Sequence, residues 1–217
     1  MTHLEIELKT LKTETTDMWK LVLSQLDKAL HSFKTFDTDF AREVVSNEKR
    51  VNSMELKIDR DCENIFALFN PVAVDLRFVL ATLKINNNLE RIGDIAEGIS
   101  LYIISEKEPF DEDLLKITKI TEMFKDANNI VQDVLNAFEK EDTKLARSIF
   151  QKDEKLDEIN IEANTNVTAY ITKNPEKIEQ ALNALSIIRR LERVGDQSKN
   201  IAEEIIFYLE AKVLKHR

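Results

Sequence analysis

The hexapeptide LERIGD at residues 89–94 returns as LERVGD at residues 191–196, and both copies offer acidic side chains in a fixed pattern. Each copy holds a glutamate and an aspartate four residues apart, namely Glu90 with Asp94 and Glu192 with Asp196. On a helix this spacing puts both side chains on one face, where like charges repel. Such carboxylates are relieved by protonation or by a bound cation, so the motif indicates cation binding.

Repetition distinguishes these pairs from the other acidic pairs of the chain. With 40 acidic residues in 217, about seven pairs at this spacing arise by chance, and a single pair is ordinarily a solvated helix face. Five of six letters are shared by two halves that have otherwise diverged, which favours a common role. Each copy also holds a mid-helix glycine, Gly93 or Gly195, which indicates close helix packing or the close approach of a bound group.

More polar residues recur at helical spacing upstream of each motif. They are Glu48, Asn52, Glu55 and Asp59 in the first half, and Asp153 and Asp157 in the second. If these stripes face the motifs, each half gathers several carboxyl groups, and two unit charges about 4 Å apart repel by about 4 kcal/mol at an effective dielectric of about 20. All-oxygen ligands select hard cations such as Mg, Mn, Ca or iron. The pattern therefore predicts two metal sites.

The composition predicts an all-α protein, since only three Gly and three Pro accompany 43% apolar and 33% charged residues. A net charge of -9 argues against nucleic-acid binding, which normally needs a cationic stripe. Cys62 has no partner for an internal disulfide, so we expect a buried thiol and a reducing compartment. The start MTHLEIELKT lacks the features of a signal peptide, and no run approaches eighteen apolar residues. We expect a cytoplasmic protein without direct membrane insertion.

Apolar spacing and capping residues divide the chain into six long helices of about 30 residues, each about 45 Å long. The first covers about 4–32, and Asp37 caps a second that runs to about Phe69. The pairs Asn70-Pro71 and Asn174-Pro175 each read as an N-cap followed by a first-turn proline.

The segment 105–115, with Pro109 and Asp111 as a further cap, separates the halves, and a break near 141–143 separates the fourth and fifth helices. The acids of the first motif border an apolar seam made of Ile85, Leu89, Ile92, Ala96 and Ile99. The expected fold is a tandem repeat of two antiparallel three-helix bundles, 1–107 and 108–217.

At these residues the sequence resembles the PhoU family of phosphate-regulatory proteins. The resemblance covers almost the whole chain and is carried by MELKIDRDCENI at 54–65, by PVAVDLRFVLATLKINNNLERIGDIAEGI at 71–99 and by RRLERVGDQSKNIAEEIIFYLEAK at 189–212. It implies two PhoU repeats that hold multinuclear metal clusters in Glu/Asp-x-x-x-Asp motifs. Metals reported across such proteins include iron, zinc, magnesium and manganese.

The resemblance also implies which residues bind these clusters. Glu48, Glu90 and Asp94 would hold one, with Asn52 beside them, and Asp153, Asp157, Glu192 and Asp196 would hold the other. Asn52 stands where the second half has Asp157, so weaker binding is expected in the first half. Gly98 replaces the asparagine that the family often has, present here as Asn200.

The role implied by the resemblance is that of a negative regulator of phosphate uptake and of the phosphate-starvation response. The implied partners are the ATPase of the phosphate ABC transporter, a sensor histidine kinase, and a second copy of the chain in a homodimer. These partners rest on the resemblance and on nothing in composition or spacing.

Two other readings stay open. One is a metal-free helical adaptor whose acidic stripes are solvated or bind a basic partner surface. The other is a carboxylate-bridged di-metal enzyme, but such sites use Glu-x-x-His pairs. The histidines His3, His31 and His216 do not follow a glutamate by three residues. A non-catalytic protein is therefore expected.

Overall fold

The computed structural model describes residues 2–214, and within them the chain is helical throughout, with short connections. The elements in chain order are α1 (His3–Thr35), α2 (Thr38–Phe69), α3 (Ala73–Ser105), α4 (Glu112–Thr118), α5 (Ile120–Lys140), α6 (Thr143–Lys173), the 3₁₀ turn η1 (Pro175–Lys177) and α7 (Ile178–Glu210). The predicted all-helical class is confirmed, as are the connections before α2, α4 and α6. No helix of residues 2–214 is long and apolar enough to cross a membrane.

Aspartates begin three of these helices as N-caps. Asp37 accepts from the Asp39 N–H at 3.0 Å, and Asp111 accepts from the N–H groups of Asp113 and Leu114. Asp142 caps α6 in the same way. Each carboxylate satisfies backbone donors that have no partner inside the helix, as predicted for Asp37 and Asp111.

The prediction of six continuous helices is wrong at the fourth. Lys119 adopts a left-handed conformation with φ 55° and divides the expected helix into α4 and α5, so the described chain has seven α-helices. The Thr118 hydroxyl donates to the Leu114 carbonyl at 2.7 Å, at the point where the helix stops. Because neither glycine nor proline stands at this position, the sequence carries no usual signal for the break.

The first Asn-Pro pair was also read wrongly. Asn70 is the left-handed C-cap of α2 with φ 45°, and α3 begins only at Ala73 after Val72 as N-cap. Pro71 is buried in the connection. The second pair fits better, because Pro175 starts η1, although the Asn174 side chain makes no capping bond.

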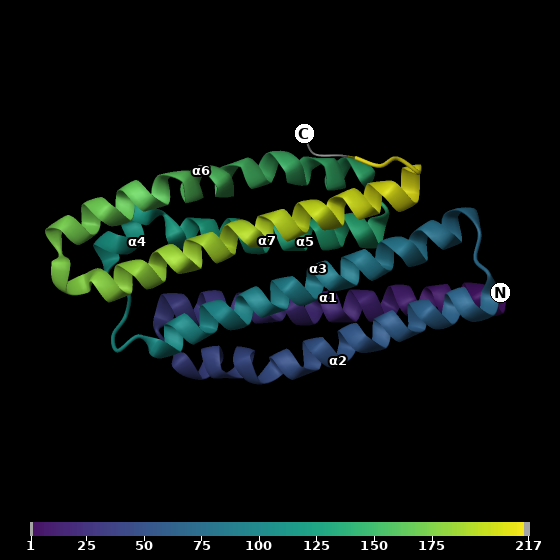
Figure 1. The fold of residues 1–217 in the computed structure, drawn as a ribbon, viewed down its shortest axis with the longest axis horizontal. Helices are drawn as coiled ribbons and strands as arrows, with labels where there is room; N and C mark the ends of the chain where they lie inside the picture. Colours follow the sequence, from purple (N-terminus) through teal and green to yellow (C-terminus); the bar gives the residue numbers. More distant parts are fainter. Residues whose placement is uncertain (1, 215–217) are drawn as a thin grey trace.

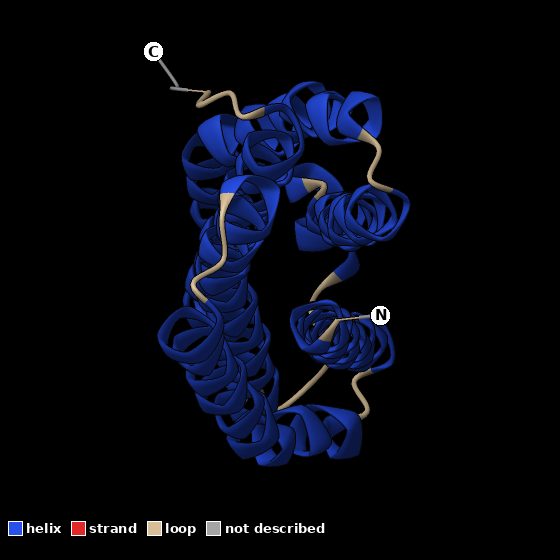
Figure 2. Ribbon diagram, turned by 90° about the vertical axis from the view of Figure 1, so that its right-hand side faces the viewer, coloured by secondary structure: helices blue, strands red, loops and turns tan. Residues whose placement is uncertain are grey.

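The helices form two bundles that lie side by side along the long axis of the molecule, α1 to α3 below and α4 to α7 above in Figure 1. The end-on view in Figure 2 shows α3 and α7 stacked along one side, where the bundles meet. Helices α1 and α5 form a second contact between the bundles, while α2 packs on α1 and α3, and α6 packs on α5 and α7. The outer helices α2 and α6 thus hold equivalent positions against the motif helices α3 and α7.

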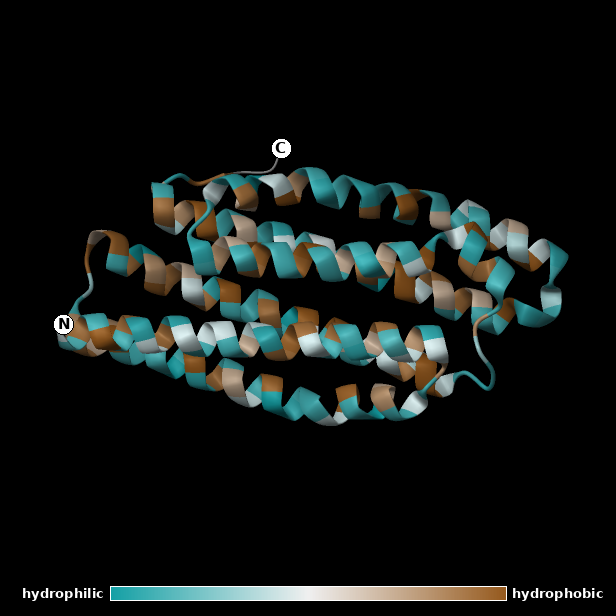
Figure 3. Cartoon of the chain, turned by 180° about the vertical axis from the view of Figure 1, so that it is seen from behind, coloured by the Kyte–Doolittle hydropathy of each residue, from teal (hydrophilic) through white to brown (hydrophobic). Residues whose placement is uncertain are grey.

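The buried hydrophobic side chains of both bundles form one continuous core. Figure 3 shows the pattern behind it, with hydrophobic and hydrophilic residues alternating around each helix. Trp19 of α1 is fully buried and packs against Phe138 of α5, with tilted rings whose centroids are 5.6 Å apart. Its indole N–H donates to the Val131 carbonyl at 3.3 Å. The apolar seam predicted for α3 is buried, and so is Cys62.

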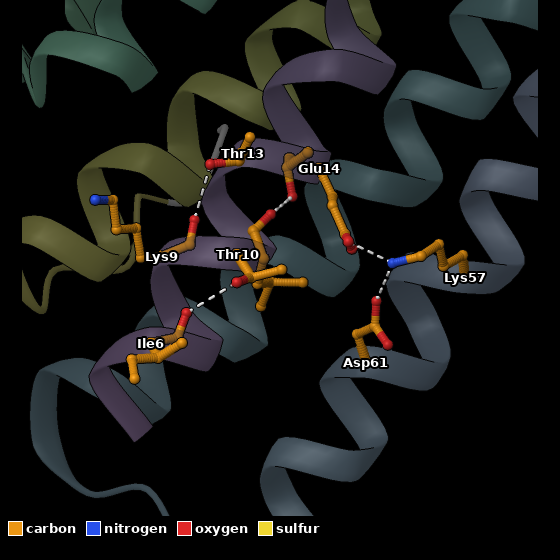
Figure 4. A network of polar contacts seen from close by, with 9 residues as sticks. Ile6, Lys9, Thr10, Thr13, Glu14, Lys57 and Asp61 are labelled. Atoms are coloured by element: carbon orange, nitrogen blue, oxygen red, sulfur yellow. Dashed lines mark hydrogen bonds and ion pairs between the residues drawn. The ribbon is translucent and has the colours of Figure 1, made fainter. Parts of the chain in front are cut away.

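A polar network ties α1 to α2 on the solvent side. Lys57 of α2 forms ion pairs with Glu14 of α1 and, at 2.8 Å, with Asp61 one turn further along α2 (Figure 4). The hydroxyls of Thr10 and Thr13 donate to carbonyls of their own helix. Burial raises the pKa of Glu14, which Lys57 opposes.

Candidate metal centres

Glu48 of α2 lies in the interface with α3, at the level of the first motif. Its side chain is buried with the residue 6% exposed, and neither carboxylate oxygen has a hydrogen-bond partner. Gly93 lies directly opposite, because a Cβ there would stand 3.4 Å from Glu48 Oε2 and 3.1 Å from Val51 Cγ1. The missing side chain of Gly93 therefore lets α2 pack close against α3, with Val51 in the tightest contact and Glu48 beside it.

The surrounding charges are also negative. Burial, followed by repulsion from Asp94, Glu97 and Glu90, raises the pKa of Glu48 to about 7. Burial likewise raises the pKa of Glu90 to about 7, followed by the charges of Asp94 and Glu55. We call Glu48, Glu90, Asp94 and Glu97 the first acidic cluster. Its carboxyl groups come from two helices and carry more negative charge than the fold neutralises.

The remaining polar residues of the α2 stripe, Asn52, Glu55 and Asp59, have different surroundings. Asn52 lies exposed one turn after Glu48. Glu55 is half-buried, and burial and then Asp59 and Asp94 raise its pKa. Asn86 of α3, which sequence reasoning missed, donates its amide to the Glu55 carbonyl at 2.9 Å and to Asp59 Oδ1 at 2.8 Å. Asp59 is thus already satisfied by a hydrogen bond.

The second motif has an equivalent arrangement between α6 and α7. Asp153 of α6 is 1% exposed, and its Oδ1 has no hydrogen-bond partner. A Cβ on Gly195 would overlap this oxygen, so the second motif glycine also makes room for a carboxylate of the neighbouring helix. Burial raises the pKa of Glu192, as do Asp196, Asp157 and Asp153. These four acids form the second acidic cluster.

A lysine that sequence reasoning missed sits inside the second cluster. Lys199 of α7 is ion-paired with Asp153 Oδ2 and, at 2.9 Å, with Asp196 Oδ1. Burial would lower the pKa of Lys199, but the hydrogen bonds to both aspartates raise it overall. Burial raises the pKa of Asp153 despite the lysine. Lys199 follows the motif aspartate by three residues, and the equivalent residue in the first half, 102 residues earlier, is Glu97. Within residues 2–214, the second cluster therefore contains an ion-paired lysine, whereas no ion pair reaches the acids of the first cluster.

The structure thus brings three of the predicted acids, Glu48, Glu90 and Asp94, together at the α2–α3 interface. It brings all four predicted acids of the second half together between α6 and α7. Within residues 2–214 no three His, Cys, Asp or Glu side chains stand close enough together to be ligands of one metal ion as placed. The residue types nevertheless fit a hard cation, because Glu48 and Asp153 each present a buried oxygen that lacks a hydrogen-bond donor. A cation would supply the missing compensation for these charges.

Comparison with known proteins places this geometry in a family. The model of the PhoU domain matches residues 15–103 and 120–205, one match in each half. The chain belongs to the PhoU family. The two matches also confirm the predicted tandem repeat.

Individual relatives match over nearly their whole length. A PhoU homologue of Thermotoga maritima, called a phosphate-specific transport system accessory protein, is 33% identical over 98% of this chain and 91% of its own. The Escherichia coli accessory protein PhoU is 31% identical over 97% of this chain and 86% of its own. These relatives are named as accessory proteins, and the family is one of regulators and not of enzymes, as predicted.

Two solved structures confirm the fold. The crystal structure of PhoU from Pseudomonas aeruginosa superposes with a TM-score of 0.89 at 30% identity, covering 96% of this chain and 99% of that one. The phosphate transport system regulatory protein PhoU from Streptococcus pneumoniae gives 0.87 at 27% identity, covering 99% and 100%.

Proposed function

We propose that this protein regulates phosphate uptake and the phosphate-starvation response. The support is the PhoU family membership together with relatives named for phosphate transport. In this role it restrains the response when phosphate is plentiful, acting in the cytoplasm as a homodimer between the ATPase of the phosphate ABC transporter and a sensor histidine kinase. The repeat units are residues 1–107 and 108–217, which meet in the connection between α3 and α4.

The proposal includes a metal at each acidic cluster. The observation that carries it is Glu48, a buried carboxylate with both oxygens unpartnered and with Glu90, Asp94 and Glu97 close enough to raise its pKa. Oxygen ligands suit iron, magnesium or manganese, and zinc also accepts carboxylates. The metal would supply positive charge that holds neighbouring helices together, and the cluster would be multinuclear where the acids outnumber the needs of one ion.

The two clusters would bind metal through different sets. In the first, Glu48, Glu90 and Asp94 provide charged oxygens, and exposed Asn52 offers a neutral one. In the second, the ligands are Asp153, Asp157, Glu192 and Asp196. Lys199 already neutralises part of the second cluster, so a metal must displace the lysine from Asp153 to use both oxygens. We therefore expect the second cluster to bind metal more weakly than four acids without a lysine would.

Metal analysis of protein purified without a histidine tag tests this proposal. The double variant Glu192→Ala, Asp196→Ala removes two acids of the second cluster, while Glu154→Ala, Glu158→Ala removes the same charge at the same spacing from the exposed side of α6. We expect the first variant to lose bound metal and the second to retain it. Equal metal content in both variants and in the parent would reject the second centre.

The alternative is a metal-free adaptor, and the Lys199 pair with Asp153 favours it in the second half, where part of the negative charge is already neutralised. An adaptor predicts metal-free protein that retains the regulatory role. Deletion of the gene followed by measurement of phosphate-starvation transcripts in phosphate-rich medium tests that role. We expect derepression, and unchanged transcripts would argue against regulation by this protein.

A further inference from the structure

A pocket of about 320 Å³ opens between α3 and α7, close to where the two motifs meet. Three arginines line it, namely Arg91 of the first motif, Arg193 of the second, and Arg190 one turn before Arg193. Its volume corresponds to roughly ten water molecules at about 30 Å³ each, which suits a small solvated ligand. The pocket is thus a cationic feature on a chain whose net charge is -9.

Gly98 is the residue that makes room for the third arginine. A Cβ on Gly98 would overlap the guanidinium group of Arg190, so any other side chain there would force Arg190 to move. The same guanidinium lies over the Tyr102 ring, 5.5 Å from its centroid. Arg190 is half-buried, whereas Arg91 and Arg193 are exposed. The glycine and the ring therefore fix one guanidinium at the pocket wall.

The equivalent place in the other half of the repeat holds different residues. The residue 102 positions after Gly98 is Asn200, and the residue 102 positions before Arg190 is Asn88. These two asparagines contact each other, with Asn200 Nδ2 donating to Asn88 Oδ1 at 3.4 Å. Where one side of the α3–α7 contact has an arginine against a glycine, the other has two neutral amides. The contact of an arginine with a glycine at the pocket wall is therefore not repeated at the equivalent positions, Asn88 and Asn200.

The guanidinium groups are available to a ligand. Within residues 2–214 none of the three forms an ion pair with a carboxylate, although the charge of Arg91 opposes the rise that burial causes in the pKa of Glu90. Arg147, in contrast, binds Glu210 with two nitrogens at 2.8 and 2.9 Å. Asp94 and Glu97 also line the pocket, so its formal balance is three cations against two anions. Both acids lie close enough to Glu48 to raise its pKa, which places them toward α2.

We propose that this pocket binds a free tetrahedral oxyanion, inorganic phosphate, through Arg91, Arg190 and Arg193. Guanidinium groups are always charged and present planar forks of donors that match phosphate oxygens. The inference rests on the proposed function and goes beyond its metal sites, because the groups that would bind the anion are arginines of α3 and α7, although Asp94 of the first acidic cluster also lines the pocket. Phosphate binding here would give a protein of this family a direct contact with the ion whose uptake its relatives serve.

Isothermal titration calorimetry with inorganic phosphate, at constant ionic strength and after treatment with a chelator, tests the site independently of any metal. We expect the parent protein to bind phosphate and Arg190→Gln to bind it at least about tenfold more weakly, since hydrogen bonds to charged groups are among the stronger ones. Gly98→Asn should weaken binding similarly by displacing Arg190. Arg193→Gln, at an exposed position, repeats the test without disturbing the helix contact.

The matched control is Arg189→Gln. Arg189 precedes Arg190 and is exposed. It does not line the pocket, and its guanidinium donates to Asn164 Oδ1 at a distance of 3.2 Å. Its removal changes the net charge equally, so affinity should stay within about twofold. Absence of phosphate binding by the parent protein would overturn the proposal. An equal loss in Arg189→Gln and Arg190→Gln would also overturn it, because the attraction would then be to net charge and not to this pocket.

Discussion

Replacing Glu48 by glutamine should stabilise the metal-free protein at alkaline pH. The Glu48 side chain is buried among acids, and burial followed by the charges of Asp94, Glu97 and Glu90 raises its pKa from 4.5 to about 7. A carboxyl group with a raised pKa binds its proton more tightly in the folded than in the unfolded state. The free energy of unfolding is therefore unaffected by this shift below about pH 4.5. It decreases as the pH rises from 4.5 to about 7, and the full loss remains at higher pH.

The size of the effect follows from the shift. One pKa unit corresponds to 1.36 kcal/mol, so a shift from 4.5 to about 7 costs the folded state about 3 kcal/mol at pH 8. Glutamine has nearly the same shape and no charge, and its amide can donate to the neighbouring carboxylates. For a chain of 217 residues this is a rise of roughly 6–12 °C in the unfolding midpoint.

Thermal unfolding followed by circular dichroism between pH 5 and 8, with a chelator present, measures this difference. The midpoint of Glu48→Gln should exceed that of the parent protein by a margin that grows with pH. Glu63→Gln is the control, because Glu63 is exposed on the same helix. A margin independent of pH, or an equal gain in the Glu63 variant, would refute the assignment of Glu48 as an uncompensated buried acid.

Other substitutions address the second cluster and the core. Lys199→Met should destabilise the metal-free protein by about 3 kcal/mol in urea unfolding at pH 8, because it leaves the buried Asp153 without its cation; a loss no greater than at pH 5 would contradict this. Gly195→Ala should lower the free energy of unfolding more than Gly93→Ala. A Cβ at position 195 would overlap Asp153 Oδ1, whereas the nearest atom to a Cβ at position 93 would be 3.1 Å away. Overpacking of this kind costs about 1–3 kcal/mol. Cys62 is fully buried, and burial raises the pKa of its thiol to about 12, so it should react with a disulfide reagent only after unfolding; rapid labelling of the native protein would be inconsistent with this core.

Most of the fold could be read from the sequence, because the helices follow local rules. Asp37 and Asp111 cap helices in the structure as they were expected to. The break at Lys119 could not be predicted, since a lysine is not a usual residue for the left-handed conformation that it adopts there, with φ 55°. Asn70 was misread because asparagine suits both an N-cap and a left-handed C-cap, and only the position of Ala73 decides between them.

The sequence predicted which acids share a helix face, but it did not predict which of their charges are neutralised in the fold. The i, i+4 spacing placed Glu90 with Asp94 and Glu192 with Asp196, and the structure brings Glu48 to the first pair across the α2–α3 interface. Lys199 does not belong to the acidic pattern, although the sequence shows a lysine at 199 where the first half has Glu97, three residues after the motif aspartate. The role of Gly98 needed the structure, because the arginine that fills its space comes from the other half.

Anomalous diffraction from crystals of metal-replete protein tests the central claim most directly. The account predicts peaks between α2 and α3 beside Glu48 and Asp94, and between α6 and α7 beside Asp153 and Asp196. Peaks confined to other surfaces, with Glu48 still without a partner and Lys199 still bound to Asp153, would contradict it.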